Sequence, residues 1–147
     1  MPVPDMQAKV SWVDNLRFIG RSASGHSMVF DANSEDSTAP SPMEMVLMSA
    51  GACSSVDVVS ILKKARQQVL GCEVELTAER ADSVPRVFTK IHLHFVVSGH
   101  DLSEKQVARA VDLSADKYCS VSIMLASSVA VSHSYSVNNA NQTAASE

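Results

Sequence analysis

This sequence has no excess of basic residues. It contains 12 Lys and Arg against 16 Asp and Glu, which gives a formal net charge of −4. Proteins that hold phosphate backbones or anionic lipid by charge need the opposite balance. We therefore expect no nucleic-acid partner. The first residues, MPVPDMQAKV, also lack a cationic segment followed by an apolar stretch and a small-residue cleavage site. Nothing marks the chain for secretion, and we expect a cytoplasmic protein.

Long hydrophobic runs are also scarce. The longest uncharged run that is mainly apolar, residues 45–56, is well below the roughly 20 residues that a bilayer span needs, so we expect no membrane span. The composition is 46% hydrophobic over 147 residues, which suits one compact domain that buries its own core. We expect that domain over residues 1–137, followed by a mobile tail over residues 138–147.

Cysteine is sparse, and its pattern excludes two common uses. The three cysteines are an odd number, and in a reducing compartment they are not expected to form a disulfide framework. Neither CxxC nor HExxH occurs, so the usual zinc-site spacings are missing and we expect no metal or other cofactor. If one of these thiols has a function, we therefore expect it to be a chemical reaction and not a structural disulfide.

The first forty residues contain three short segments typical of antiparallel strands. Apolar and polar residues alternate over residues 6–12, and Asp14-Asn15 offers a turn into residues 16–21. A second turn at Gly25-His26 leads to residues 28–30. The sequence therefore predicts a three-stranded antiparallel sheet at the start of the fold.

A long helix should follow. Ser41, Pro42 and Glu44 form a capping box with proline at the first helical position, and Gly71 can end the helix near residue 70. Asp57 is the only charged residue between residues 45 and 62, so the helix is apolar nearly all round. Such a helix is expected inside the molecule or at a subunit interface.

The remaining residues predict two long strands, two helices and a last strand. Alternating residues indicate a hairpin over residues 72–79 and 87–97. Ser103 begins a helix to about residue 117, Ser120 caps a shorter helix, and residues 129–137 alternate as a strand. Because hairpins dominate over crossovers, the fold class is α+β with antiparallel sheets around a long buried central helix.

Two of the three cysteines have unusual neighbours. Cys53 lies among small side chains, where a substrate or another backbone could approach closely, although a free thiol is often simply a buried apolar residue. Cys119 stands where one helix ends and another begins, a place where backbone N–H groups lower a thiol pKa; a partly buried spacer cysteine is the alternative. Cys72 faces inward on a strand, and simple packing explains it.

Two stretches carry a resemblance to a known family. Ser41-Pro42-Met43-Glu44-Met45-Val46-Leu47 leads into Gly51-Ala52-Cys53, and Ala115-Asp116-Lys117-Tyr118-Cys119-Ser120-Val121 brings the second cysteine 66 residues after the first (119 − 53). Together with the order of elements, they resemble the OsmC/Ohr family of thiol-dependent hydroperoxide reductases, and more narrowly its YhfA-like branch. The resemblance implies an intertwined homodimer with a two-cysteine site on each side at the subunit boundary.

The resemblance also implies a chemistry, that of a cysteine-based peroxidase in oxidative stress defence. Cys53 would attack the O–O bond of an organic hydroperoxide as thiolate and become a sulfenic acid, which Cys119 would resolve as a disulfide. A dithiol must then reduce that bond, and in relatives the donor looks like a lipoyl-type dithiol. Nothing in the sequence specifies this reductant.

Further site residues follow from the same resemblance. Peroxidatic members pair an Arg from the early strands with a Glu near the start of the central helix; Arg17 is preferred over Arg21 for the first role. In those relatives the Glu directly follows the Pro, whereas here Met43 intervenes and displaces Glu44 by one residue. Asp57, one turn beyond Cys53, would raise the thiol pKa, so a cation must come from elsewhere in the assembly.

Other interpretations stay open from the sequence alone. A non-catalytic protein of the same fold could bind an apolar small molecule or another protein, with vestigial or redox-sensing thiols. A structural stress protein without a ligand is a third interpretation. His92 and His94 share a strand face at a spacing that metal ligands can have, but no third ligand is evident and an exposed strand explains them.

Overall fold

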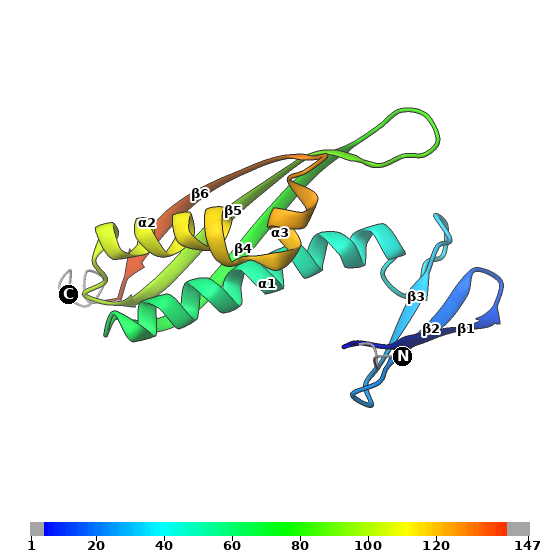
Figure 1. Ribbon diagram of the computed structural model, residues 1–147, viewed down its shortest axis with the longest axis horizontal. Helices are drawn as coiled ribbons and strands as arrows, with labels where there is room; N and C mark the ends of the chain where they lie inside the picture. The colour runs from blue at the N-terminus through cyan, green and yellow to red at the C-terminus, as the bar shows by residue number, and fades with distance from the viewer. Residues whose placement is uncertain (1–4, 141–147) are drawn as a thin grey trace. The chain divides into compact units, whose positions relative to one another are not determined.

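The computed structural model describes residues 5–140, and its chain divides into two compact units, Met1–Val46 and Leu47–Glu147. The first unit holds strands β1, β2 and β3 and the start of helix α1 (Figure 1). The second holds the rest of α1, strands β4 to β6, and the helical segments α2, η1 and α3. Two three-stranded sheets and one long helix confirm the predicted α+β class. The prediction of a single domain over residues 1–137 stays a prediction.

The first unit is an antiparallel sheet in the order β1-β2-β3, as predicted. Its strands are β1 (Ala8–Asp14), β2 (Arg17–Ser22) and β3 (Ser27–Asp31). Asn15 begins the β1–β2 turn with a positive φ of 43°, a conformation that asparagine tolerates better than most residues. The local turn signals of this sequence therefore predict the local structure well.

Helix α1 (Pro42–Lys64) begins where the sequence predicts and ends earlier. The capping box forms, because the Glu44 N–H donates to Ser41 Oγ at 3.1 Å and the Ser41 N–H donates to Glu44 Oε1 at 3.0 Å. The predicted end near residue 70 is wrong. Arg66 adopts the left-handed conformation with φ of 59°, and the next N–H, that of Gln67, donates back to the Leu62 carbonyl. This is the closure that glycine usually makes, so the sequence hides it.

The second sheet has the order β4-β5-β6 and is mixed. β4 (Gln68–Arg80) pairs antiparallel with β5 (Phe88–His100), as predicted, whereas β6 (Ala130–Asn139) runs parallel to β5. The helical segments between β5 and β6 supply the crossover that a parallel pair requires. β6 extends two residues into the expected tail, and residues 141–147 lie outside the described residues.

The helical crossover differs from its prediction in two places. α2 (Glu104–Leu113) begins after Ser103, whose Oγ accepts from the Gln106 N–H at 3.3 Å, as expected. The predicted continuation to residue 117 is instead η1 (Ser114–Tyr118), a π-helical turn, a feature frequent at functional sites. α3 (Ser120–Leu125) is capped by Cys119 and not by Ser120, so the prediction of the cap is wrong by one residue.

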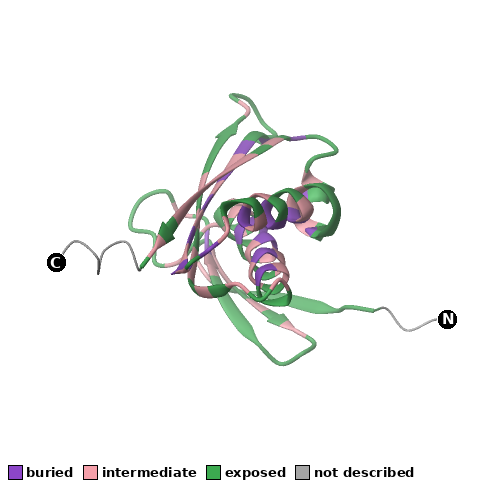
Figure 2. Cartoon of the chain, turned by 90° about the vertical axis from the view of Figure 1, so that its left-hand side faces the viewer, coloured by how far each residue is buried: buried purple, intermediate pink, exposed green. Residues whose placement is uncertain are grey.

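The core of the second unit lies between its helices and one face of its sheet (Figures 1 and 2). Val58 and Leu62 of α1 are fully buried, as are the inward side chains of β5 such as Phe95. At Gly51 a Cβ atom would lie 2.7 Å from Leu76 Cδ1, so a larger residue there would force the Leu76 side chain or α1 to shift. This close approach fixes the helix segment that carries Cys53.

Helix α1 is buried along one face only within this chain, and its expected place inside the molecule or at a subunit interface stays a prediction. Val46, Met48 and Val56 are exposed on it. Among the described helices, α1 alone is long and apolar enough to cross a membrane, so the count of uncharged residues overlooked a stretch that qualifies. Its close packing on β4 and its polar contacts, described below, are those of the core helix of a globular fold.

Candidate functional site, a two-cysteine cluster

The structure brings Cys53 and Cys119 into contact within the second unit. Cys53 lies on α1, and Cys119 lies at the junction of η1 and α3. Each thiol shifts the pKa of the other, which places the two side chains near each other, and both cysteines are free thiols. Two sulfurs that are 66 residues apart in sequence (119 − 53) are therefore neighbours, as the resemblance implied.

The first N–H groups of α3 point at these two sulfurs. The Ser122 N–H donates to Cys119 Sγ at 3.4 Å, while the N–H groups of Val121 and Ser120 lower the pKa of the Cys53 thiol. The first turn of a helix has no carbonyl partners for such N–H groups, so a sulfur atom takes that place here. The break between η1 and α3 is what makes these donors available.

Two serines complete the arrangement, and sequence reasoning missed both. Ser54 Oγ donates to Cys119 Sγ at 3.1 Å and lies 3.1 Å from Ser122 Oγ. We call Cys53, Ser54, Cys119 and Ser122 the dithiol cluster. Each serine follows a cysteine closely in the chain, but the sequence is rich in serine throughout this region, so nothing distinguishes these two before their side chains are placed.

The two thiols differ in their access to solvent. Cys119 has 0% of its surface exposed, and Ser54 and Ser122 are buried beside it. Cys53 is only partly buried. A reactant that diffuses to the cluster from solution therefore meets the Cys53 sulfur first.

The pKa of Cys53 is raised above the usual thiol value. The Val121 N–H pulls the pKa down, but burial and the hydrogen bond and charge of Cys119 push it up further. Asp57 acts elsewhere than predicted, because its Oδ2 lies 3.3 Å from Ser114 Oγ, which also donates to the Ser54 carbonyl at 3.1 Å. The thiolate on Cys53 alone is therefore not favoured within this unit.

The pKa of Cys119 is lowered, although burial acts against this. The hydroxyls of Ser122 and Ser54, the Ser122 N–H and the Cys53 thiol all favour the charged sulfur. Hydrogen bonds donated to an anion stabilise it in proportion to their number and alignment. Of the two sulfurs, Cys119 is therefore the one that more readily loses its proton.

Cys72 stands apart from this cluster. It lies on β4 with its pKa raised by burial, against a smaller lowering by the Ser55 hydroxyl. Ser55 Oγ also donates to the Gly51 carbonyl at 2.8 Å, one turn back along α1. These contacts agree with the expectation that Cys72 serves packing.

Arg17 and Glu44 belong to the first unit, and each has a local partner there. Arg17 forms an ion pair with Asp14, whose hydrogen bond raises the pKa of the guanidinium and lowers that of the carboxyl. Glu44 closes the capping box, and the Ser41 N–H lowers its pKa. That either residue serves the thiol site stays a prediction.

His92 and His94 join a row of serines on one face of the second sheet. His92 bridges Ser132 and Ser134 at 2.7 and 2.8 Å, and His94 bridges Ser134 and Ser136 at 2.7 and 3.3 Å. Within residues 5–140, no three His, Cys, Asp or Glu side chains are grouped closely enough to hold a metal ion. The imidazole nitrogens are used in these cross-strand hydrogen bonds.

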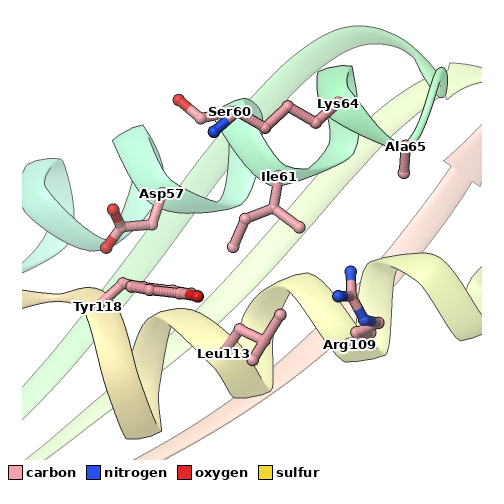
Figure 3. A pocket seen from close by; sticks show the side chains of 8 residues that line it. All are labelled: Asp57, Ser60, Ile61, Lys64, Ala65, Arg109, Leu113 and Tyr118. Carbon is pink, nitrogen blue, oxygen red and sulfur yellow. The ribbon is translucent and has the colours of Figure 1, made fainter.

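A groove of about 520 Å³ lies beside the dithiol cluster, between α1 on one side and α2 and η1 on the other (Figure 3). Asp57 points from α1 toward η1, and Arg109 points from α2 toward α1. Neither cysteine lines this groove, but two of its residues adjoin the cluster: Tyr118 precedes Cys119, and Asp57 contacts Ser114. Its walls combine apolar and charged side chains, namely Asp57, Ser60, Ile61, Lys64, Ala65, Arg109, Leu113 and Tyr118.

Comparison with known proteins gives a consistent result. A profile of the family described as OsmC-like protein matches residues 34–134. Protein YhfA of Escherichia coli strain K12 is 62% identical over 132 residues, which cover 90% of this chain and 98% of that protein. A solved structure of a hypothetical protein from Aquifex aeolicus VF5 is 30% identical, with a TM-score of 0.81 over 94% of this chain and 98% of that one.

A second solved structure shares the fold at much lower identity. It is described as an organic hydroperoxide resistance protein OsmC from Legionella pneumophila, and it is 15% identical with a TM-score of 0.69 over 93% of this chain and 100% of that one. The family that the two cysteine motifs predicted is thereby confirmed. The chain belongs to the OsmC-like protein family, in the branch that includes YhfA.

Proposed function

We propose that this protein is a thiol-dependent peroxidase that reduces organic hydroperoxides, with Cys53 as the attacking thiol and Cys119 as the resolving one. The observation that carries the proposal is the contact between a partly exposed sulfur and a fully buried one. The exposed thiol can meet the peroxide, and the buried thiol is already in place to close a disulfide. The name of the Legionella pneumophila neighbour supports organic hydroperoxides as the substrate class.

The reaction runs in three steps. The Cys53 sulfur attacks the terminal oxygen of ROOH, the O–O bond breaks, ROH leaves with a proton, and Cys53 becomes a sulfenic acid. The Cys119 sulfur then attacks the Cys53 sulfur, the S–O bond breaks, and hydroxide leaves to become water. An external dithiol reduces the disulfide by exchange and becomes a disulfide itself. A lipoyl-type dithiol is one such donor, and the cytoplasm is the compartment in which dithiols of this kind stay reduced.

The working form in this proposal is a homodimer. The exposed apolar side chains of α1 need cover, and a second copy of the chain offers the same apolar helix in return. In this proposal the dimer also brings Arg17, which is held by Asp14, to a thiol site. Glu44, at the start of α1, is the proposed carboxylate partner of Arg17 there. Since the pKa of Cys53 is raised within its own unit, a cation from the assembly would lower it.

Peroxide consumption tests the proposal. Reduced protein is mixed with tert-butyl hydroperoxide and an excess of dithiol, and peroxide loss is followed for the wild type, Cys53→Ser, Cys119→Ser and Cys72→Ser. We expect Cys53→Ser to abolish turnover and Cys119→Ser to leave an overoxidised or trapped Cys53. Cys72→Ser is the matched control and should keep the activity, because Cys72 lies outside the cluster.

The groove favours a second candidate, a binding protein of the same fold for a small amphipathic molecule. Apolar Ile61 and Leu113 line its walls together with the cationic side chains of Lys64 and Arg109. The same experiment separates the two candidates. Equal and slow peroxide loss in all four proteins would reject the peroxidase and leave the binding protein.

A further inference from the structure

We propose that Ser54 and Ser122 are positioning residues that hold Cys119 as the thiolate of the reduced pair, so that Cys119 serves as the base for Cys53. This inference rests on the proposed function for its catalytic meaning, but the state of the sulfur can be measured without any peroxide. It changes the role of Cys119, which then acts before the disulfide step as well as in it.

The hydroxyl groups form a chain that ends on the sulfur. Ser54 Oγ has one hydrogen, which it donates to Cys119 Sγ at 3.1 Å. Its contact with Ser122 Oγ at 3.1 Å must then use the Ser122 hydrogen. The direction of this chain presents a donor to Cys119, and each hydroxyl in it is polarised toward the sulfur.

Two donors from two helices meet on Cys119. They are the Ser54 hydroxyl from α1 and the Ser122 N–H from the first turn of α3, and the nearby Cys53 thiol also lowers the Cys119 pKa. Cys119 is fully buried, so bulk water does not replace these donors and each lost hydrogen bond leaves the charge less stabilised. A neutral thiol would need none of them.

The charged and titratable groups around the cluster are few and identifiable. On α1 they are Cys53 itself and Asp57, and Asp57 is joined to Ser114 and through it to the Ser54 carbonyl. On η1 they are Asp116, Tyr118 and Lys117, whose Nζ lies 5.7 Å from the Tyr118 ring centre. On β4, Cys72 contacts Ser55 and not Ser54. The donors on Cys119, rather than a neighbouring cation, therefore account for its acidity.

This arrangement gives Cys53 a base. As Cys53 attacks ROOH, its S–H proton passes to the Cys119 sulfur, the S–O bond forms and the O–O bond breaks. The leaving RO⁻ takes a proton back from Cys119 and departs as ROH, which restores the Cys119 thiolate. That thiolate then attacks Cys53 in the sulfenic acid, and hydroxide leaves. The single proton that the reduced pair carries thus moves from Cys53 to Cys119 and then to the leaving alkoxide.

The first test measures the thiolate directly. In a Cys53→Ser, Cys72→Ser background, Cys119 is the only cysteine, and its ultraviolet thiolate absorbance is followed against pH. Ser54→Ala should raise the midpoint by about 1 pH unit or more, because it removes a hydrogen bond to a charged group, and Ser122→Ala should raise it by less, because it removes the hydroxyl that polarises Ser54. Ser55→Ala is the matched control, since Ser55 donates within α1 and contacts Cys72. A midpoint unmoved in both cluster variants, or moved equally by Ser55→Ala, would overturn the inference.

A second measurement separates this inference from the proposed function. The full-cysteine protein and its Ser54→Ala and Ser54→Thr variants are treated with tert-butyl hydroperoxide, and sulfenic acid is trapped with dimedone. We expect slower oxidation and longer-lived sulfenic acid in Ser54→Ala, with partial rescue in Ser54→Thr, whose hydroxyl can still donate. Wild-type protein that never oxidises but shows the predicted titration rejects the peroxidase and keeps the thiolate. If the protein is oxidised normally but the serine variants do not shift the Cys119 titration, the thiolate inference is rejected and the peroxidase proposal stands.

Discussion

The two units of this chain treat their apolar side chains in opposite ways. In the second unit, residues such as Val58, Leu62 and Phe95 are fully buried. In the described part of the first unit, the only buried residue is a carboxylate, Asp31, while Trp12 is 68% exposed. The second unit therefore has its own core, and the first does not.

This difference implies that the first unit is stabilised by contacts with a surface that covers it. A three-stranded sheet needs an apolar face that is covered, and a contiguous exposed apolar surface of this kind marks an interaction site. Val10, Phe18, Phe30 and Pro42 also line an apolar hollow of about 330 Å³ on this unit. A second copy of the chain would cover these residues, which is what the proposed homodimer supplies.

Phe95→Ala should have the largest effect on stability, because it acts on the unit that has a core. Phe95 is 2% exposed on the central strand of the second sheet, and its removal leaves a large cavity. We expect the free energy of unfolding to fall by about 3–5 kcal/mol, measured by denaturant titration. The loss should be the same at high and low protein concentration. A loss that grew on dilution would show that this core depends on the assembly.

Trp12→Ser should have the next largest effect, and it should act through association. Trp12 is exposed in the isolated chain, so the chain alone predicts almost no cost. If the first unit is covered in a dimer, a buried tryptophan is lost, and we expect the dimer dissociation constant to rise about 30-fold or more, measured by sedimentation over a dilution series.

Val84→Ser is the matched control for that experiment. Val84 is 89% exposed in the loop between β4 and β5, and we expect it to leave the dissociation constant unchanged. If both variants had the same dissociation constant, the exposed apolar residues of the first unit would not form a dimer interface. The proposed cover for the first unit would then be wrong.

The sequence predicted most of the local structure of both units, whereas the closeness of Cys53 and Cys119 was implied only by the resemblance to a family. Hairpin turns, the Ser41 capping box and strand alternation are signals within a few residues, so they could be read directly. The contact of Cys53 with Cys119 spans 66 residues (119 − 53), and only the resemblance to a family could place it. The fold class and the family were both confirmed.

What the sequence could not predict depends on the placement of individual groups. The end of α1 was missed because Arg66, not a glycine, takes the left-handed conformation. The parallel pairing of β6 follows from where the crossover packs, which strand periodicity does not encode. The roles of Ser54 and Ser122 depend on hydroxyl directions, so serine-rich segments alone could not reveal them.

The smallest of the predicted effects concerns Asp31, the buried carboxylate of the first unit. Its oxygens accept from the N–H groups of Asn33 and Thr38 at 2.9 and 3.0 Å and from Thr38 Oγ1 at 2.8 Å. These donors lower its pKa from the usual 3.8 to about 2, chiefly through the Asn33 N–H. Since the folded pKa is depressed, the stabilisation is complete above 3.8 and is lost as the pH falls through about 2.

Asp31→Asn tests this pH dependence, with Trp12, the single tryptophan and part of the first unit, as the fluorescent reporter. The amide cannot ionise, so the variant should be less stable than the wild type at neutral pH and should lack this part of the acid transition. The stability gap between the two proteins should then close between pH 3.8 and about pH 2, where the wild-type carboxyl becomes protonated. A gap that stayed constant with pH would mean that Asp31 holds the loop by shape alone. The first unit would then have neither a hydrophobic core nor a buried ionic anchor of its own, and its order would depend on the surface that covers it.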